Sequence, residues 1–117
     1  MGRLLEEDEA KCALQLSTIA ELRELGARGV VLSLEAAGER TLYPAFQFAE
    51  SGRPFPEISR VLRIFSGAAD SPYTVASWLM SPNPLLDQRT PAEWMRTGRD
   101  PELLFEAARR SAAPLAH

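Results

Sequence analysis

The side chains that most often carry out catalysis are scarce in this sequence and badly placed for it. His117, the only histidine, is the last residue, and Cys12 is the only cysteine. One terminal histidine cannot build a Ser-His-Asp arrangement, and one cysteine can form neither an internal disulfide nor a cysteine-based metal site. No glycine-rich phosphate loop follows a predicted strand. We therefore expect no catalytic residues, no metal site and no cofactor, and interpret the protein as a binding protein rather than an enzyme.

Arginines in the last third of the sequence are the first candidates for binding. Arginine's planar guanidinium pairs with carboxylates and phosphates through two parallel hydrogen bonds. This cluster is either a solvated charged face or a surface that complements an acidic partner, and it consists of Arg89, Arg96, Arg99, Arg109 and Arg110. Asp100, Glu102 and Glu106 could pair with some of them through helical neighbours, most obviously Glu102 and Glu106 with Arg109 and Arg110. Arg89, Arg96 and Arg99 would then be left free for a partner.

Two tryptophans are the second candidates, because tryptophan is over-represented among residues that anchor interfaces. Trp78 lies in the most apolar predicted helix, which favours a place in the core. Trp94 is flanked by charged residues on a short predicted helix, so a core position and a binding position are both open for it.

The stretch Ser81–Arg99 positions most of these candidates. Pro82 and Pro84 remove two backbone donors and fix two φ angles, so this part is a turn, with Asn83 between them. Thr90-Pro91-Ala92-Glu93 is a capping box with proline at the first helical position, and Gly98 suits the end of that helix. We predict a proline-pinned turn that leads into a short capped helix.

The same stretch is similar to the toxin-binding domain of Xre/MbcA/ParS-type antitoxins. The similarity rests on Trp78–Asp87, Arg89-Thr90-Pro91 and Thr97-Gly98-Arg99, and it covers roughly residues 43–110. Gln88 stands where the family usually has glycine, and Trp94 where it usually has a small aliphatic residue. The resemblance implies an antitoxin of a bacterial type II toxin–antitoxin pair. Because the N-terminal residues do not resemble a signal peptide, we expect a cytoplasmic location. The implied partner is a RES-domain toxin that degrades NAD.

The resemblance also implies a mechanism and a set of contacts. The C-terminal domain would cover the toxin's active-site cleft, with the last helix or the tail reaching towards the active site. The implied toxin-binding residues are Asn83, Arg89, Trp94, Arg96, Arg99, Arg109, Arg110 and Leu115.

Helical patterns fill the rest of the C-terminal half. Ile58, Val61, Leu62 and Phe65 follow helical spacing, and Ser71-Pro72 and Asp100-Pro101 begin two further helices. We expect residues 49–117 to form a compact helical domain, with residues 57–112 helical and packed as one unit. Its buried residues should include Ile58, Leu62, Phe65, Trp78 and Leu79. Residues 111–117 have few apolar anchors and are predicted to be a mobile tail.

The N-terminal half predicts a helix-turn-helix followed by a β-hairpin. Helices are expected over 6–15 and from the capping box at Thr18 up to Gly26. Gly29–Leu34 reads as the best strand, and Arg40–Tyr43 as its partner after the Ala37-Gly38-Glu39 turn. We therefore assign residues 1–48 to a degenerate winged-helix-like head, in a protein that is mostly α with one small hairpin.

Such a head suggests the alternative function, a DNA-binding transcriptional regulator or autorepressor. Thr18 and Arg23 are the residues that could touch DNA, although only weakly. Residues 1–50 carry five basic and nine acidic side chains, whereas the whole chain has 13 and 16. Backbone phosphates would repel these carboxylates, which favours a head used for packing or dimerisation. DNA binding and a homodimer both stay open, and no apolar run is long enough to predict a membrane span.

Overall fold

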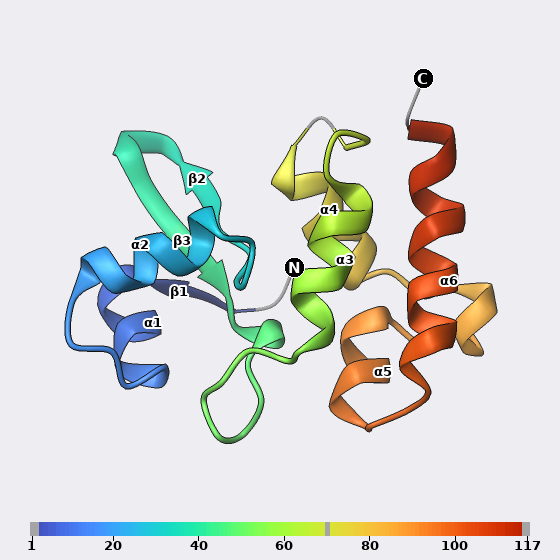
Figure 1. Cartoon of the computed structure of the whole chain (residues 1–117), viewed down its shortest axis with the longest axis horizontal. Helices are drawn as coiled ribbons and strands as arrows, with labels where there is room; N and C mark the ends of the chain where they lie inside the picture. The colour runs from blue at the N-terminus through green and yellow to red at the C-terminus, as the bar shows by residue number, and fades with distance from the viewer. Residues whose placement is uncertain (1–2, 70, 116–117) are drawn as a thin grey trace.

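Two sides of the molecule correspond to the two halves of the chain (Figure 1). The structure is a computed structural model that describes residues 3–69 and 71–115. The head precedes residue 49 and contains the following elements: β1 (Leu4–Glu6), α1 (Glu7–Ala13), α2 (Ile19–Ala27), β2 (Leu34–Ala36) and β3 (Arg40–Pro44). The helical body follows it and contains α3 (Glu57–Phe65), α4 (Pro72–Leu79), α5 (Pro91–Arg96) and α6 (Pro101–Ala112).

The head has the connectivity of a winged helix. Helices α1 and α2 are followed by the β2–β3 hairpin, whose turn contains Gly38 at φ +77°. The N-terminal strand β1, which the sequence analysis did not predict, pairs with β3 and completes an antiparallel sheet of order β1-β3-β2. The predicted fold, mostly helical with a helix-turn-helix-like head and a β-hairpin, is confirmed.

The prediction of a strand over Gly29–Leu34 is wrong, because only Leu34 belongs to β2. Val31 and Leu32 are buried, with exposures of 1% and 2%. The side chain of Gln47 makes the hydrogen bonds to the Leu32 backbone that a neighbouring strand would otherwise make. The Leu32 amide donates to Gln47 Oε1 at 2.6 Å, and Gln47 Nε2 donates to the Leu32 carbonyl at 2.8 Å. The apolar residues of this segment are there because it is buried. A short apolar run does not by itself distinguish a strand from another kind of buried segment, so the sequence pattern was misleading.

Each helix of the body begins near the residue that the sequence indicated. Ser71, Thr90 and Asp100 cap α4, α5 and α6 with their side chains, and each is followed by proline at the first helical position. The prediction of an all-helical segment over 57–112 is confirmed for its described residues, apart from the turns that join the helices. Ile58, Phe65 and Leu79 are buried, whereas Leu62 and Trp78 are half-buried against the core.

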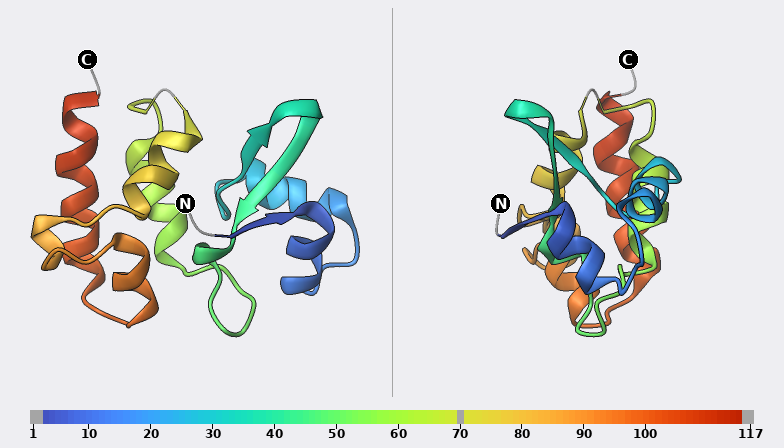
Figure 2. Two further views of the ribbon diagram at one scale, coloured as in Figure 1. Left: turned by 180° about the vertical axis from the view of Figure 1, so that it is seen from behind. Right: turned by 90° about the vertical axis from the view of Figure 1, so that its left-hand side faces the viewer.

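The main core crosses the boundary at residue 48. Leu32 and Leu34 of the head pack in one apolar cluster with residues of the body such as Ile58, Val61 and Val75. A smaller cluster inside the head surrounds Leu22 and Tyr43. The Tyr73 hydroxyl of α4 also donates to the Glu35 carbonyl of β2 at 2.7 Å. The two halves are therefore packed against each other, as the view from behind also shows (Figure 2).

The C-terminal segment is more ordered than predicted. Helix α6 runs to Ala112, and a 3-10 turn covers Ala113–Leu115. Ser111 lies inside α6, where its hydroxyl accepts a hydrogen bond from Trp78 Nε1 at 2.8 Å. Residues 111–115 of the predicted tail are thus helical, and His117 lies outside the described residues. No helix of the described part is long and apolar enough to cross a membrane.

Candidate partner-binding surface

Asn83 organises the turn before α5. Its side-chain Oδ1 accepts from the Leu85 amide at 2.9 Å, and its backbone amide donates to the Arg89 carbonyl at 3.0 Å. The Gln88 amide returns to the Asn83 carbonyl at 2.9 Å, which closes the turn. Asp87 and Gln88 both have positive φ, 54° and 63°, so the glycine expected at position 88 would suit this backbone better. Asn83 is thus half-buried and engaged in shaping the turn.

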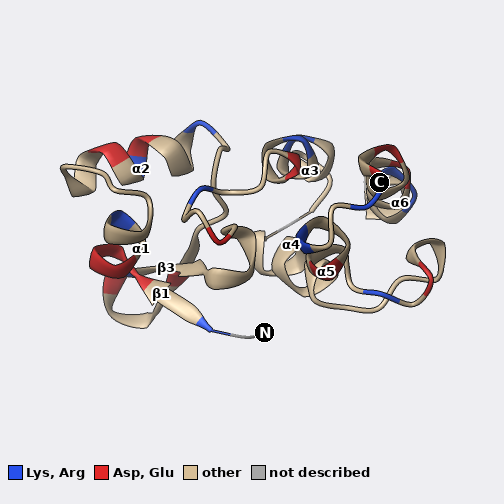
Figure 3. Ribbon diagram, turned by 90° about the horizontal axis from the view of Figure 1, so that it is seen from below, with Lys and Arg blue, Asp and Glu red and all other residues tan. Residues whose placement is uncertain are grey.

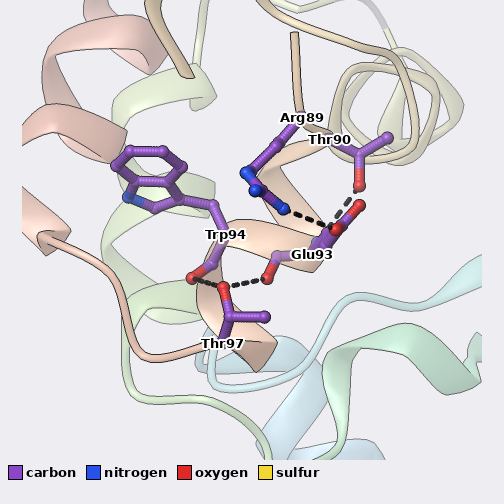
Figure 4. A network of polar contacts seen from close by, with 5 residues as sticks. All are labelled: Arg89, Thr90, Glu93, Trp94 and Thr97. Carbon is purple, nitrogen blue, oxygen red and sulfur yellow. Dashed lines mark hydrogen bonds and ion pairs between the residues drawn. The ribbon is translucent and has the colours of Figure 1, made fainter. Parts of the chain in front are cut away.

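Helix α5 is held by a network that uses one of the predicted binding arginines (Figure 4). Thr90 Oγ1 accepts from the Glu93 amide at 3.1 Å, and the Arg89 guanidinium donates to Glu93 Oε1 at 3.0 Å. Thr97 Oγ1 donates to the Glu93 carbonyl at 2.9 Å. Arg89 is therefore paired, contrary to the expectation that it is left free.

Trp94 belongs to the core rather than to an exposed contact. Its side chain is 5% exposed, and its indole Nε1 donates to the Asp100 carbonyl at 2.8 Å. The Arg99 guanidinium lies 5.4 Å from the ring centroid, on the solvent side. Of the two positions that the sequence left open for Trp94, the structure has the buried one.

The remaining arginines fall into two groups at opposite ends of α6. Arg96 and Arg99 are exposed and precede its first turn, whereas Arg109 and Arg110 lie in its last turn. From Pro101, where α6 begins, to Arg109, about 12 Å of helix separates the groups at 1.5 Å per residue. Leu115, 43% exposed, lies just beyond the second group. The arginines that appear as one cluster in the sequence are thus two surfaces.

The second group is paired with Glu106, one of its two predicted partners, whereas Glu102 forms no ion pair with a described residue. Glu106 accepts from Arg110 at 2.9 Å and from Arg109 at 3.1 Å. These two bonds, with that from Arg110 the stronger, hold the pKa of the Glu106 carboxyl below its usual range. Within residues 3–69 and 71–115, Arg96 and Arg99 have no such carboxylate partner, so the first group carries the positive charge that is available to a partner.

The two residues considered for DNA contact are engaged within the head. Thr18 caps α2, and its hydroxyl accepts from the Glu21 amide at 3.2 Å. Arg23 donates twice to the Glu7 carboxylate, at 2.9 and 3.2 Å, which keeps the pKa of Glu7 low. Red segments of the ribbon mark the acidic residues of α1 and α2 in the view from below (Figure 3). The exposed face of α2 therefore offers little that would attract phosphates.

A groove at the seam between head and body was missed by the sequence analysis. It has a volume of about 450 Å³, and its large apolar lining residues are Phe46, Phe48, Phe55 and Met80. Its charged lining residues are Arg3, Glu93 and Arg96, and we call it the seam groove. The two phenylalanines of the Tyr43–Phe48 segment, spaced two apart, were the available sequence signal.

These features define the class of protein: a mostly helical protein in which a small head with a three-stranded antiparallel sheet is joined to a helical body. Among solved structures, the chain is similar to the NMR structure of a protein named Rv2175c, with a TM-score of 0.79 and 16% sequence identity. The match covers 95% of this chain and 82% of that one. At this identity the likeness shows a shared fold alone. No protein-family model and no curated protein matches the sequence.

Proposed function

We propose that this protein is an antitoxin of the Xre/MbcA/ParS type, which neutralises a RES-domain toxin by covering its active-site cleft. The observation that carries the proposal is the segment from Trp78 to Arg99, whose residues resemble the family's toxin-binding domain at the family's spacing. In the structure this segment is a closed turn followed by a capped helix, which presents Arg96 and Arg99 to solvent.

The exposed positive charge on this side of the molecule suits inhibition by occlusion. A cleft that binds NAD must accommodate phosphates, and exposed guanidinium groups could occupy the same positions or pair with acidic residues at the rim. Inhibition of this kind requires complementarity rather than catalytic groups on the inhibitor. Two surfaces compete for the inhibitory role: the one with Arg96 and Arg99, and the end of α6 with Leu115.

Co-expression with the RES-domain toxin encoded in the neighbouring reading frame tests the proposal. We expect the wild-type protein to restore growth and intracellular NAD. The double variant Arg96→Glu/Arg99→Glu should lose protection if α5 is the inhibitory surface. A protein that ends at Ala112 should lose protection if the C-terminal turn is the inhibitory surface. This end point keeps the Trp78–Ser111 hydrogen bond.

Arg63→Glu is the matched control, because Arg63 is an exposed helix arginine on α3 and belongs to neither surface. It should protect like the wild type, and circular dichroism should show all variants folded. Failure of the wild-type protein to protect, or absence of a RES-domain gene beside it, would contradict the proposal. Full protection by both folded test variants would instead move the inhibitory surface elsewhere.

A second candidate, a DNA-binding regulator, is favoured by one observation, the winged-helix connectivity of the head. Against it stand the acidic residues of α1 and α2 and the pairing of Arg23 with Glu7. We expect the isolated protein to bind its own promoter DNA weakly and only at low salt. Fluorescence anisotropy with labelled promoter DNA measures this directly. Tight binding at physiological salt without a partner would favour the regulator.

A further inference from the structure

The seam groove combines an apolar floor with an uneven distribution of charge. Its aromatic residues come from the segment that joins the two halves, Met80 from the end of α4, and Arg96 from α5. The four large apolar side chains are half-buried, so each keeps surface that faces the groove. Methionine and phenylalanine together form a floor that adapts to an inserted apolar side chain.

The charges around the groove favour an acidic occupant. Glu93, its only lining carboxylate among the described residues, already accepts from Arg89 at 3.0 Å. Arg96 makes no ion pair with any described residue, and Arg3 pairs with Glu9 through a guanidinium that is 72% exposed. The rim of the seam groove therefore has positive charge that is not neutralised within the described residues, although the net charge of the chain is −3.

The groove lies beside the residues on which the proposed function rests. Thr90, Ala92 and Glu93 of the α5 capping segment form part of its wall. A partner that contacts Arg96 and Arg99 would therefore reach the mouth of the groove without leaving the surface of α5.

We propose that the seam groove receives an apolar side chain of the toxin, next to a carboxylate of the toxin that pairs with Arg96. This inference rests on the proposed antitoxin function and adds to it the chemistry of one contact. It places the joining segment of the head in the interface, rather than the helical body alone.

Methionine methyl groups provide a direct test in the unmodified chain. The sequence has three methionines, of which Met80 lines the groove and Met95 is 3% exposed in the core. In a spectrum of protein labelled at the methionine methyls, addition of the neighbouring RES-domain toxin should shift the Met80 signal. The Met95 signal is the internal control and should move little. The Met80→Leu and Met95→Leu variants assign the two signals.

Affinity measurements test the charge. Arg96→Glu should weaken toxin binding at least about tenfold, whereas Arg63→Glu, with the same charge change outside the groove, should stay within about twofold. Met80→Gln, which keeps the side-chain length and adds a polar amide, should also weaken binding. Thermal unfolding monitors whether each variant remains folded.

The outcomes separate the two proposals. If wild-type protein does not bind the toxin, the antitoxin function fails, and this inference with it. If it binds while the Met80 signal stays unchanged and Arg96→Glu binds normally, only the groove contact is overturned. If the Met80 signal instead shifts on dilution of the protein alone, the occupant is a second copy of this chain, which also overturns the proposal.

Discussion

Among single residues, Gln47 has the largest part in holding the segment around Leu32 in place within the head. It is the one buried polar side chain of the described core, at 0% exposure, and it satisfies the amide and carbonyl of Leu32 as well as the carbonyl of Pro44. Buried backbone groups without partners are costly, so this one amide allows Val31 and Leu32 to be buried without being part of a strand.

Gln47→Leu should therefore destabilise the protein by about 2–4 kcal/mol, since it leaves buried backbone groups of Leu32 unpaired in a site of similar volume. Urea unfolding followed by circular dichroism gives this free energy. The control is Gln15→Leu, the same replacement at an exposed position, with an expected change within about 0.5 kcal/mol. Equal effects of the two replacements would show that the Gln47 hydrogen bonds contribute nothing.

Gly52 is required by both its conformation and its surroundings. Its φ is +89°, and an added Cβ would lie 2.1 Å from the Ala13 carbonyl oxygen, where the 49–53 loop touches the end of α1. We expect Gly52→Ala to cost more than about 2 kcal/mol, through left-handed strain and a displaced loop.

The matched control for Gly52 is Gly67, at φ +80° with no atom within 4 Å of an added Cβ. Gly67→Ala carries the strain without the collision and should cost about 1–2 kcal/mol. The difference between the two variants in thermal or urea unfolding isolates the contact with Ala13. Similar losses would mean that the loop moves away freely.

At the scale of elements, the Glu7–Arg23 pair joins α1 to α2. The hydrogen bond from Arg23 lowers the pKa of Glu7, so in acid the folded state binds fewer protons than the unfolded chain. The pair therefore stabilises the head above the unfolded pKa of Glu7, and this contribution is lost as the pH falls through the folded pKa. It also keeps Arg23 away from any phosphate.

Replacing Arg23 should restore the usual behaviour of Glu7. In Arg23→Gln, an NMR titration of the Glu7 carboxyl should give a pKa higher than in the wild type, and stability should depend less on pH in the acidic range. Arg28→Gln, which changes an exposed arginine at the end of α2, should leave the Glu7 pKa unaltered. A Glu7 pKa that is equal in wild type and Arg23→Gln would contradict the pairing in solution.

At the scale of the whole molecule, the head and the body depend on one another for their core. Leu32 and Leu34 are fully buried among residues of α3 and α4, and removal of the head would expose that face to water. Full burial of each such side chain contributes roughly 1.5–3 kcal/mol, a large part of the stability of a small domain.

A protein that starts at Tyr43 should therefore fail to unfold cooperatively, although the resemblance to the antitoxin family starts there. We expect a broad thermal transition and rapid amide exchange in α3 and α4, compared with a sharp transition for the full chain. A cooperative transition in the shortened protein would show that the body is an independent domain. For the same reason, tests of the antitoxin function need the full head.

The sequence alone determined the order and the boundaries of most elements, because the signals for them are local. The capping residues Ser71, Thr90 and Asp100, each followed by proline, and the glycine turn at Gly38 act within a few residues of themselves. The pairing of Glu106 with Arg109 and Arg110 was predictable in the same way, since helical spacing brings these residues together.

Tertiary structure alone decided the features that depend on contacts between distant segments. The pairing of β1 with β3, the use of Gln47 as a partner for Leu32, the burial of Trp94 and the seam groove all join residues from different elements. The division of the late arginines into two surfaces follows from the length of α6, which keeps Arg99 and Arg109 at its opposite ends. Local patterns contain no information on which distant surface a side chain meets, because packing of the whole chain sets it.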